Sequence, residues 1–227
     1  MTTSQTLTTV YHRLLERYGP QHWWPGDGPL EVIIGAILTQ SAAWANVDRA
    51  LANLKRADVL SSQALREIPL ESLAELLRPS GYFNAKARKV KAFVEHLGSR
   101  HQDDLDAFLG QPPEMLRQEL LSIHGIGEET ADDILLYAAG YPFFVVDAYT
   151  RRVFERLGIT PQGPRYQDWQ DLLHGALPQE APLFNEYHAL LVAHGKATCR
   201  KTPLCEGCCL LDLCPTGQAR AGASRSL

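Results

Sequence analysis

The middle of the chain carries a turn whose residue types suit contact with a phosphate. Residues 120–131 follow helical spacing up to a Gly-x-Gly turn at Gly125 and Gly127, after which helical spacing resumes. A turn without Cβ atoms lets backbone N–H groups approach a phosphate, and the amides that begin the second helix form an anion site. Such contacts position a protein on a nucleic acid without reading its sequence. An ordinary packing corner between two helices is the alternative interpretation.

A second chemical signal is a cluster of thiols. All five cysteines lie between positions 199 and 214, and four follow a regular pattern: Cys199, Cys205, Cys208 and Cys214. A disulfide framework does not suit a cytosolic chain, whereas a metal centre needs several thiolates in one short loop. Four cysteines can hold either a tetrahedral zinc ion or an iron–sulfur cluster, and spacing alone does not choose. We interpret Cys209 as a small buried side chain that could replace Cys208.

The composition is that of an ordinary globular protein. The 227 residues include 45% hydrophobic and 21% charged residues, and no apolar run is long enough to span a bilayer. The first residues lack the basic start of a signal peptide, so we expect a cytoplasmic protein. The net charge of −4 counts against a general polyanion binder, although basic residues gather within 86–100 and 196–201.

Helical periodicity dominates the sequence. Apolar residues recur at three- and four-residue spacing, as in residues 90–97, and no segment alternates as a strand would. We therefore predict an all-α protein, with a disordered tail over residues 218–227. Breaks rich in proline and glycine separate the helical segments at residues 25–29, 79–81, 110–113 and 158–164.

The order of these features resembles one known family. Leu-x-x-Ile-x-Gly-Ile-Gly-x-x-Thr-Ala, followed by Val-Val-Asp, resembles the helix-hairpin-helix DNA glycosylases of the endonuclease III superfamily, from about Pro25 to Cys214. The resemblance implies a six-helix barrel over residues 25–141 and a second helical lobe built from residues 1–24 and 142–217. It also implies that Gly125 and Gly127 grip the backbone of double-stranded DNA, bound across the cleft between the lobes. We expect a monomer that acts on DNA containing a damaged base.

The resemblance assigns the catalytic role to Asp147. Excision of a base passes through a sugar with oxocarbenium character. A nearby ionised carboxylate stabilises that charge and can orient or deprotonate a water molecule. Asp147 is also a preferred N-cap for the helix that follows it, and the two roles are compatible.

The thiol pattern is similar to the C-terminal 4Fe-4S loop of the same family. One departure is that the gap between Cys199 and Cys205 is one residue shorter than the usual family pattern. The resemblance favours an iron–sulfur cluster over zinc, with a role in structure and DNA docking.

Glu129 occupies the position where family members that also cut the strand carry a lysine. Only an amine forms the Schiff base that permits β-elimination, and Glu128-Glu129 offers none. We therefore expect a monofunctional glycosylase that uses water and leaves an intact abasic site. In the helix that follows, we expect Asp132 and Asp133 to face solvent.

Trp23 and Trp24 give the best indication of which base is removed. Adjacent indoles can stack on an extruded base, and alkylated purines such as 3-methyladenine are cationic, which adds a cation–π attraction. The pair can equally anchor the N-terminal helix. Trp-Trp-Pro, the segment 79–87 and Glu129 resemble the 3-methyladenine DNA glycosylase branch, as does Tyr-His-x-x-x-Val followed by a lysine. By that likeness Trp24 and Glu129 line the base pocket and Lys196 lies nearby, although Lys196 can also be a helix C-terminal charge.

Three residues are expected to contact the duplex. Gln40 matches the family residue that fills the gap left by the flipped nucleotide, Tyr82 occupies the wedge position, and Lys86 lies in the basic segment. Gln40 can also be a helix-end polar residue, and Tyr82 a half-buried aromatic. We interpret four histidines without ligand spacing as surface or packing residues: His12, His101, His174 and His188.

The leading hypothesis is a monofunctional DNA glycosylase for alkylated purines. The first alternative is an oxidised-pyrimidine glycosylase of endonuclease III type whose lyase amine is absent or is supplied by Lys196. The second is a non-catalytic module that binds damaged DNA. The tryptophan pair with Glu129 distinguishes the alkylpurine glycosylase from the oxidised-pyrimidine glycosylase. For a non-catalytic binding module, Asp147→Asn would leave the DNA affinity unchanged.

Overall fold

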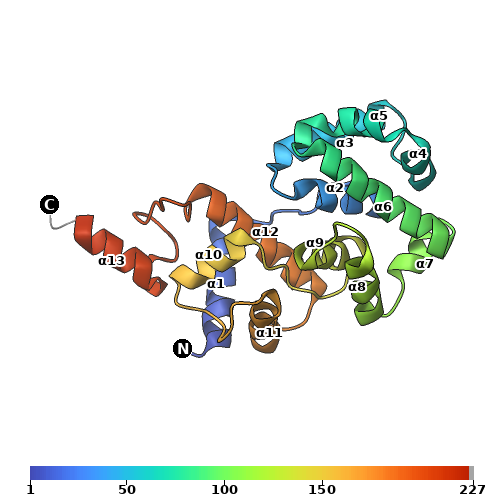
Figure 1. Ribbon diagram of the computed structural model, residues 1–227. Coiled ribbons are helices and arrows are strands. Elements are labelled where there is room, and N and C mark those ends of the chain that lie inside the picture. Colours follow the sequence, from blue (N-terminus) through green and yellow to red (C-terminus); the bar gives the residue numbers. More distant parts are fainter. Residues whose placement is uncertain (225–227) are drawn as a thin grey trace. The chain divides into compact units, whose positions relative to one another are not determined.

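The structure is a computed structural model that describes residues 1–224. These residues form thirteen α-helices with short 3₁₀ and π segments, and they contain no strand (Figure 1). The prediction of an all-α protein is confirmed. The chain divides into a central unit, Trp24–Tyr141, and a terminal unit, Met1–Trp23 with Pro142–Leu227. No helix within the described part combines the length and the apolar character that crossing a bilayer requires.

The central unit is organised around α2. Eight successive residues of this helix, 31–38, are buried, which is typical of a helix at the centre of a domain. It contacts α3, α6, α9 and the π segment η2. The elements of the unit are α2 (Pro29–Thr39), α3 (Trp44–Arg56), α4 (Ser62–Glu67), α5 (Leu70–Leu77), η1 (Arg78–Ser80), α6 (Phe83–His101), α7 (Leu105–Leu109), α8 (Pro113–Ser122), α9 (Glu128–Asp133) and η2 (Ile134–Ala138).

The terminal unit is organised around α12, which packs on α1 and α10. Tyr187 of α12 is fully buried and donates a hydrogen bond to the carbonyl oxygen of Leu7 in α1, at 2.9 Å. The rings of Phe144 and Phe154 pack edge-on against Tyr187. The elements of the unit are α1 (Thr3–Tyr18), α10 (Ala148–Arg156), α11 (Tyr166–Ala176), α12 (Ala181–Ala197), η3 (Leu211–Leu213) and α13 (Pro215–Ser224).

The C-terminal segment differs from the prediction. Where a disordered tail was expected from residue 218, the structure has α13 as far as Ser224. Pro215 suits the first helical position, and the following Ala residues are strong helix formers. Gln218 adds a hydrogen bond from Nε2 to the carbonyl oxygen of Asp212 at 2.7 Å. Residues 225–227 of the expected tail lie outside the described part.

The expectation that Asp132 and Asp133 face solvent is wrong. Asp132 is fully buried and Asp133 is 7% exposed. The reason is Arg117 of α8, whose Nε lies 2.7 Å from Oδ1 of Asp132 and whose Nη2 also donates to that carboxylate. A buried carboxylate is tolerated when a guanidinium group pairs with it in this way. The pair joins the two helices on either side of the Gly-x-Gly turn.

Lys86 is not the DNA contact that the basic segment suggested. It is only 2% exposed, and its Nζ donates to the carbonyl oxygens of Leu38 and Ser80 at 2.9 and 2.6 Å. Lys86 therefore joins the start of α6 to the ends of α2 and η1. Lys89 donates to Gln40, and Lys91 donates to the carbonyl oxygen of Arg66 at 2.6 Å. Much of the basic segment is thus used within the unit.

The buried Lys86 is expected to make the free energy of unfolding depend on pH in the alkaline range. Burial, with a smaller contribution from the charge of Lys89, lowers the pKa of Lys86 from 10.5 to about 8. Between these values the unfolded chain binds a proton that the folded chain does not. We therefore expect the free energy of unfolding to rise with pH across this window, by as much as about 3 kcal/mol. Urea unfolding of the wild type and of Lys86→Met at several pH values measures the difference.

The variant Lys201→Met, at an exposed lysine, controls for the general effects of alkaline titration. A difference between the free energies of unfolding of the wild type and Lys86→Met that stays constant across this pH window would show that folding does not lower the pKa of Lys86.

Candidate active site and metal centre

Asp147 caps α10 and lies against His188 of α12. Its Oδ1 accepts a hydrogen bond from the backbone N–H of Thr150 at 2.7 Å, which is the N-cap interaction. Its Oδ2 lies 3.6 Å from Nε2 of His188, and the two side chains are only 13% and 7% exposed. The first turn of one helix and a side chain of another therefore orient this carboxylate.

These surroundings keep the carboxyl group of Asp147 ionised. Burial alone would raise the pKa of Asp147. The neighbouring imidazole of His188 and the N–H of Thr150 outweigh burial and hold the pKa of Asp147 below its ordinary value. An ionised carboxylate can stabilise positive charge on a neighbouring carbon or accept a proton from water.

Lys196, near the end of α12, lies over two aromatic rings of the terminal unit. Its Nζ is 6.0 Å from the ring centre of Trp23 and 6.0 Å from that of Tyr149. Gly195 permits this arrangement, because a Cβ there would lie 2.4 Å from Cδ1 of Tyr149. Tyr149 therefore packs directly on the backbone of α12, close in the chain to Asp147. Lys196 itself is exposed.

Trp24 belongs to the central unit and has different neighbours. Its indole lies edge-on to Trp44, with ring centres 5.2 Å apart, and its ring centre is 5.1 Å from that of Tyr137 in η2. Gly35 of α2 forms another wall, because a Cβ there would lie 3.2 Å from Nε1 of Trp24. The three rings are half-buried. Clustered aromatic surfaces of this kind can receive a flat base.

The turn between α8 and α9 needs glycine at Gly125. That residue has φ of +87°, and a Cβ there would lie 2.4 Å from Cγ of Lys89. Both the backbone conformation and the close approach therefore require glycine. Gly127 is extended, and nothing lies within 4 Å of the place that a Cβ would occupy. The backbone at Gly127 is therefore open to an incoming group.

Gln40, at the end of α2, is bonded to this turn. Its Nε2 donates to the carbonyl oxygen of Gly125 at 3.1 Å and to Oγ1 of Thr130 at 2.9 Å, and its Oε1 accepts from Nζ of Lys89. These bonds orient the side chain of Gln40, as expected of a polar residue at a helix end. Insertion of Gln40 into a duplex stays a prediction and would require these bonds to open.

Tyr82 and Glu129 both face solvent in the central unit. Tyr82 is 75% exposed and has φ of +46°, a left-handed conformation that is uncommon for an aromatic residue. It is not half-buried, so that alternative is wrong. Glu129 is exposed in the first turn of α9. The wedge role of Tyr82 and the pocket role of Glu129 stay predictions.

The four cysteines expected to hold a metal line one cavity of the terminal unit: Cys199, Cys205, Cys208 and Cys214. Of the five thiols, all of them in the described part of the chain, only Cys209 does not line it. N–H groups point at the sulfurs: Arg156 Nη1 to Cys199 at 3.2 Å, and the backbone of Gly217 to Cys214 at 3.3 Å. Such donors stabilise thiolate charge around a metal centre. Four thiols that line one cavity are the donor set that a four-thiolate metal centre needs.

Two residues that position these groups were missed from the sequence. His188 was interpreted as a packing residue, and the structure places it on Asp147. Its signal was the Tyr-His-x-x-x-Val pattern on the helix that also carries Lys196. Lys89 was counted only as part of a basic segment, and it instead packs on Gly125 and bonds to Gln40. His174 does have the packing role expected, since its Nε2 accepts from the backbone N–H of Phe144 at 3.0 Å.

Comparison with known sequences identifies relatives along most of the chain. The model of a family described as HhH-GPD superfamily base excision DNA repair protein matches residues 34–179. A relative from Methanocaldococcus jannaschii, assigned provisionally as a DNA repair glycosylase, is 42% identical over an alignment of 212 residues that covers 90% of this chain and 94% of the relative. Endonuclease III of Sulfolobus acidocaldarius is 30% identical over 184 residues, covering 80% of this chain and 79% of that protein.

Solved structures agree with this result. A non-covalent endonuclease III–DNA complex has a TM-score of 0.84 and 24% identity, covering 97% of this chain and 99% of that one, which shows the shared fold. The 3-methyladenine DNA glycosylase of H. pylori bound to 1,N6-ethenoadenine has a TM-score of 0.72 and 27% identity, covering 86% and 98%. The family match spans more than half of the chain and includes the Gly-x-Gly turn and Asp147. The chain therefore belongs to the HhH-GPD superfamily of base-excision DNA repair proteins, as a DNA glycosylase similar to endonuclease III.

Proposed function

We propose that this protein removes alkylated purines, of the 3-methyladenine type, from duplex DNA by hydrolysis. The observation that carries this proposal is the aromatic cluster of Trp24, Trp44 and Tyr137 over Gly35. An alkylated purine is flat and cationic, so aromatic faces attract it both by stacking and by cation–π interaction. A solved relative similar to this chain is a 3-methyladenine DNA glycosylase bound to 1,N6-ethenoadenine.

In the proposed reaction Asp147 acts on the sugar. Its ionised carboxylate would stabilise the positive charge that develops as the base leaves, and it would orient the attacking water. His188 and the N–H of Thr150 act through Asp147 as positioning groups, because they keep the carboxylate charged and fix its direction. An alkylated base is already a good leaving group, so this modest assistance suffices without a covalent intermediate.

We further propose that the enzyme lacks lyase activity. Glu129 is exposed at the start of α9, where strand-cutting relatives would need an amine. A carboxylate cannot form a Schiff base with the opened sugar. The product would then be an intact strand with an abasic site.

The endonuclease III relatives support a second candidate function. Proteins of that name from Sulfolobus acidocaldarius and Escherichia coli are 30% and 28% identical to this chain. An oxidised-pyrimidine glycosylase of this type would need an amine for strand cleavage. Lys196 is the candidate, because it is exposed and lies 6.0 Å from the ring centres of Trp23 and Tyr149.

For the cofactor, we propose a 4Fe-4S cluster held by Cys199, Cys205, Cys208 and Cys214. The support is that these four thiols line one cavity and receive N–H donors. When bound, such a cluster would supply charge and rigidity to the segment between α12 and α13. Cys209 would take no part.

Incubation with duplex DNA carrying one alkylated adenine tests the proposed reaction. We expect strand breaks only after hot alkali, because base release leaves an alkali-labile abasic site, and we expect no covalent adduct after borohydride reduction. Parallel duplexes with an oxidised pyrimidine or a G·T mismatch measure selectivity. Cleavage without alkali that Lys196→Ala abolishes would support the endonuclease III type. Binding to every duplex without release of any base would leave only the binding module.

Replacing Asp147 by asparagine separates its charge from its capping role. Asparagine caps a helix as well as aspartate does, so the unfolding midpoint should stay near that of the wild type. The excision rate should fall about 10²- to 10⁴-fold. Because the pKa of Asp147 lies below its ordinary value, wild-type activity should persist as the pH falls towards 4. Asp147→Ala, which also removes the cap, is the matched control. An Asp147→Asn variant with a normal single-turnover rate would place the catalytic group elsewhere.

The cluster is tested by colour and by a pair of serine variants. Purified protein should be brown and absorb at about 400 nm, as iron–sulfur clusters do. Cys208→Ser should lose this absorbance, and Cys209→Ser should keep it, because only Cys208 of this adjacent pair lines the cavity. A colourless protein that contains one zinc ion would contradict the iron–sulfur assignment.

A further inference from the structure

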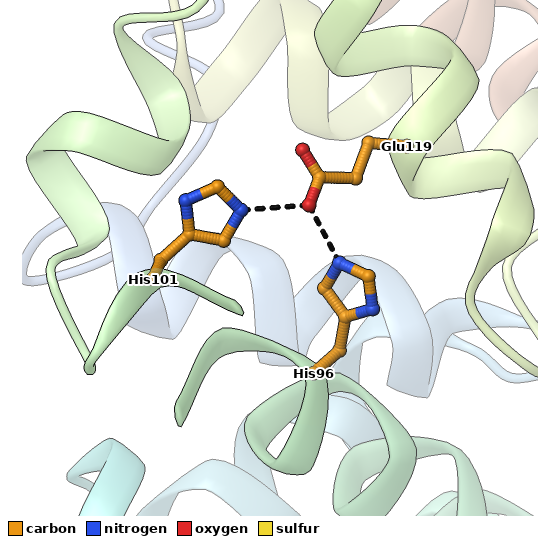
Figure 2. A group of neighbouring side chains, drawn as sticks. All are labelled: His96, His101 and Glu119. Atoms are coloured by element: carbon orange, nitrogen blue, oxygen red, sulfur yellow. Dashed lines mark hydrogen bonds and ion pairs between the residues drawn. The ribbon is translucent and has the colours of Figure 1, made fainter. Parts of the chain in front are cut away.

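Two histidines and a glutamate of the central unit lie close together, and none of them belongs to the sites described above. His96 and His101 come from the last turns of α6, and Glu119 comes from α8. Nε2 of His96 lies 2.7 Å, and Nε2 of His101 2.6 Å, from the same oxygen, Oε1 of Glu119. Figure 2 shows the two imidazole rings reaching this oxygen from different directions. One ligand atom from each residue lies within 4.8 Å of the other two.

The neighbouring residues orient this group. Nε2 of Gln111 donates to the other oxygen of Glu119, Oε2, at 2.8 Å and to the carbonyl oxygen of Phe108 at 3.0 Å. Oε1 is therefore the oxygen that faces the imidazoles. The fully buried ring of Phe108 packs edge-on against His101 and His96, with ring centres 5.0 and 6.5 Å apart. An amide that fixes a ligating carboxylate and an apolar wall beside it are typical surroundings of a metal site.

The end of α6 explains why the sequence did not reveal this group. Residues five apart do not share a face of a continuous helix. The helix ends at His101, however, and Gln102 and Asp103 follow with φ of +54° and +64°. Arg66 holds Asp103 through two hydrogen bonds of 2.7 and 2.6 Å. His101 therefore sits where the chain turns, beside Glu119 of α8.

We propose that His96, His101 and Glu119 bind one divalent cation of the zinc type through two imidazole nitrogens and one carboxylate oxygen. Two histidines and a glutamate, with solvent at the remaining position, form a known zinc ligand set. Magnesium and calcium prefer oxygen ligands throughout, and copper(I) prefers sulfur. The three side chains are 18–21% exposed, so an ion can enter from solvent.

The proposed site needs only a small rearrangement to receive the ion. Without metal, the two Nε2–H groups donate to Oε1. On binding, each ring carries its proton on Nδ1, and each Nε2 offers its lone pair to the cation. Tetrahedral bonds of about 2.0–2.1 Å place neighbouring ligand atoms about 3.3 Å apart, so the present 2.6 and 2.7 Å contacts must widen by less than about 1 Å.

The consequence for the fold would be a link between α6 and α8. The second of these helices leads directly into the turn at Gly125, and α6 supports the same turn through Lys89. Bound metal would therefore restrain the elements that carry the turn. This proposal does not depend on which base the enzyme removes.

Nitrogen-15 NMR of the histidine rings in the full-length protein tests the site during titration with zinc chloride. We expect Nε2 of His96 and His101 to shift as a metal-bound nitrogen does, while exposed His12 does not change. The unfolding midpoint should rise with zinc, because the ion binds the folded chain. Unchanged Nε2 signals of both histidines at saturating zinc would overturn the proposal.

Counting bound ions separates this site from the cysteine loop. The double variant His96→Asn/His101→Asn should bind one zinc ion fewer per chain than the wild type, since its thiols are unchanged. Gln111→Leu should bind zinc about 10- to 100-fold more weakly, because it loses the donor that fixes Glu119. His12→Asn is the matched control and should behave as the wild type. Equal zinc content in the wild type and the double variant would refute the site.

Discussion

A carboxylate that has lost most of its water stays charged only when polar groups that stabilise its charge replace that water. The proposed active site depends on this constraint at Asp147. The N–H of Thr150 and the imidazole of His188 supply the replacement, and both come from helices fixed by the same buried core. Tyr187, next to His188 in the chain, is at the centre of that core and contacts Phe144 and Phe154 on either side of Asp147 in the sequence. The packing of Tyr187 thus fixes the two helices whose groups keep Asp147 charged.

The Gly-x-Gly turn depends on contacts of a different kind. Its shape is maintained by side chains that could have been expected to bind DNA themselves. Lys89 packs on Gly125 and donates to Gln40, which itself bonds to the turn and to Thr130. Lys86 joins the start of α6 to the end of α2. Backbone groups therefore remain as the part of the turn that faces outward at Gly127. That division suits a protein with a net charge of −4, whose overall charge does not attract a polyanion.

The features that were predictable from the sequence are those with local causes. The helical periodicity, the need for glycine at Gly125 and the capping role of Asp147 each depend on a few consecutive residues. The grouping of the four thiols also has a local cause, because a short loop cannot place its members far apart: Cys199, Cys205, Cys208 and Cys214.

Other features depend on which helices pack together, and the sequence did not reveal them. Asp132 is buried because Arg117 of another helix pairs with it. His188 lies on Asp147 because α12 packs on α10. His101 meets Glu119 because α6 ends at that residue.

The division of the chain into a central unit and a discontinuous terminal unit also governs the order in which the protein can fold during synthesis. Helix α1 is made before the central unit and its partner α12 after it, and the hydrogen bond between Tyr187 and Leu7 joins residues 180 positions apart. The apolar face of α1, with Leu7, Val10 and Leu14, must therefore wait while the central unit is made. The central unit is continuous in sequence and can fold in that interval, which shortens the loop that the two ends must close. The cysteine loop follows α12 in the chain, so the proposed metal can bind only after the central unit has been made.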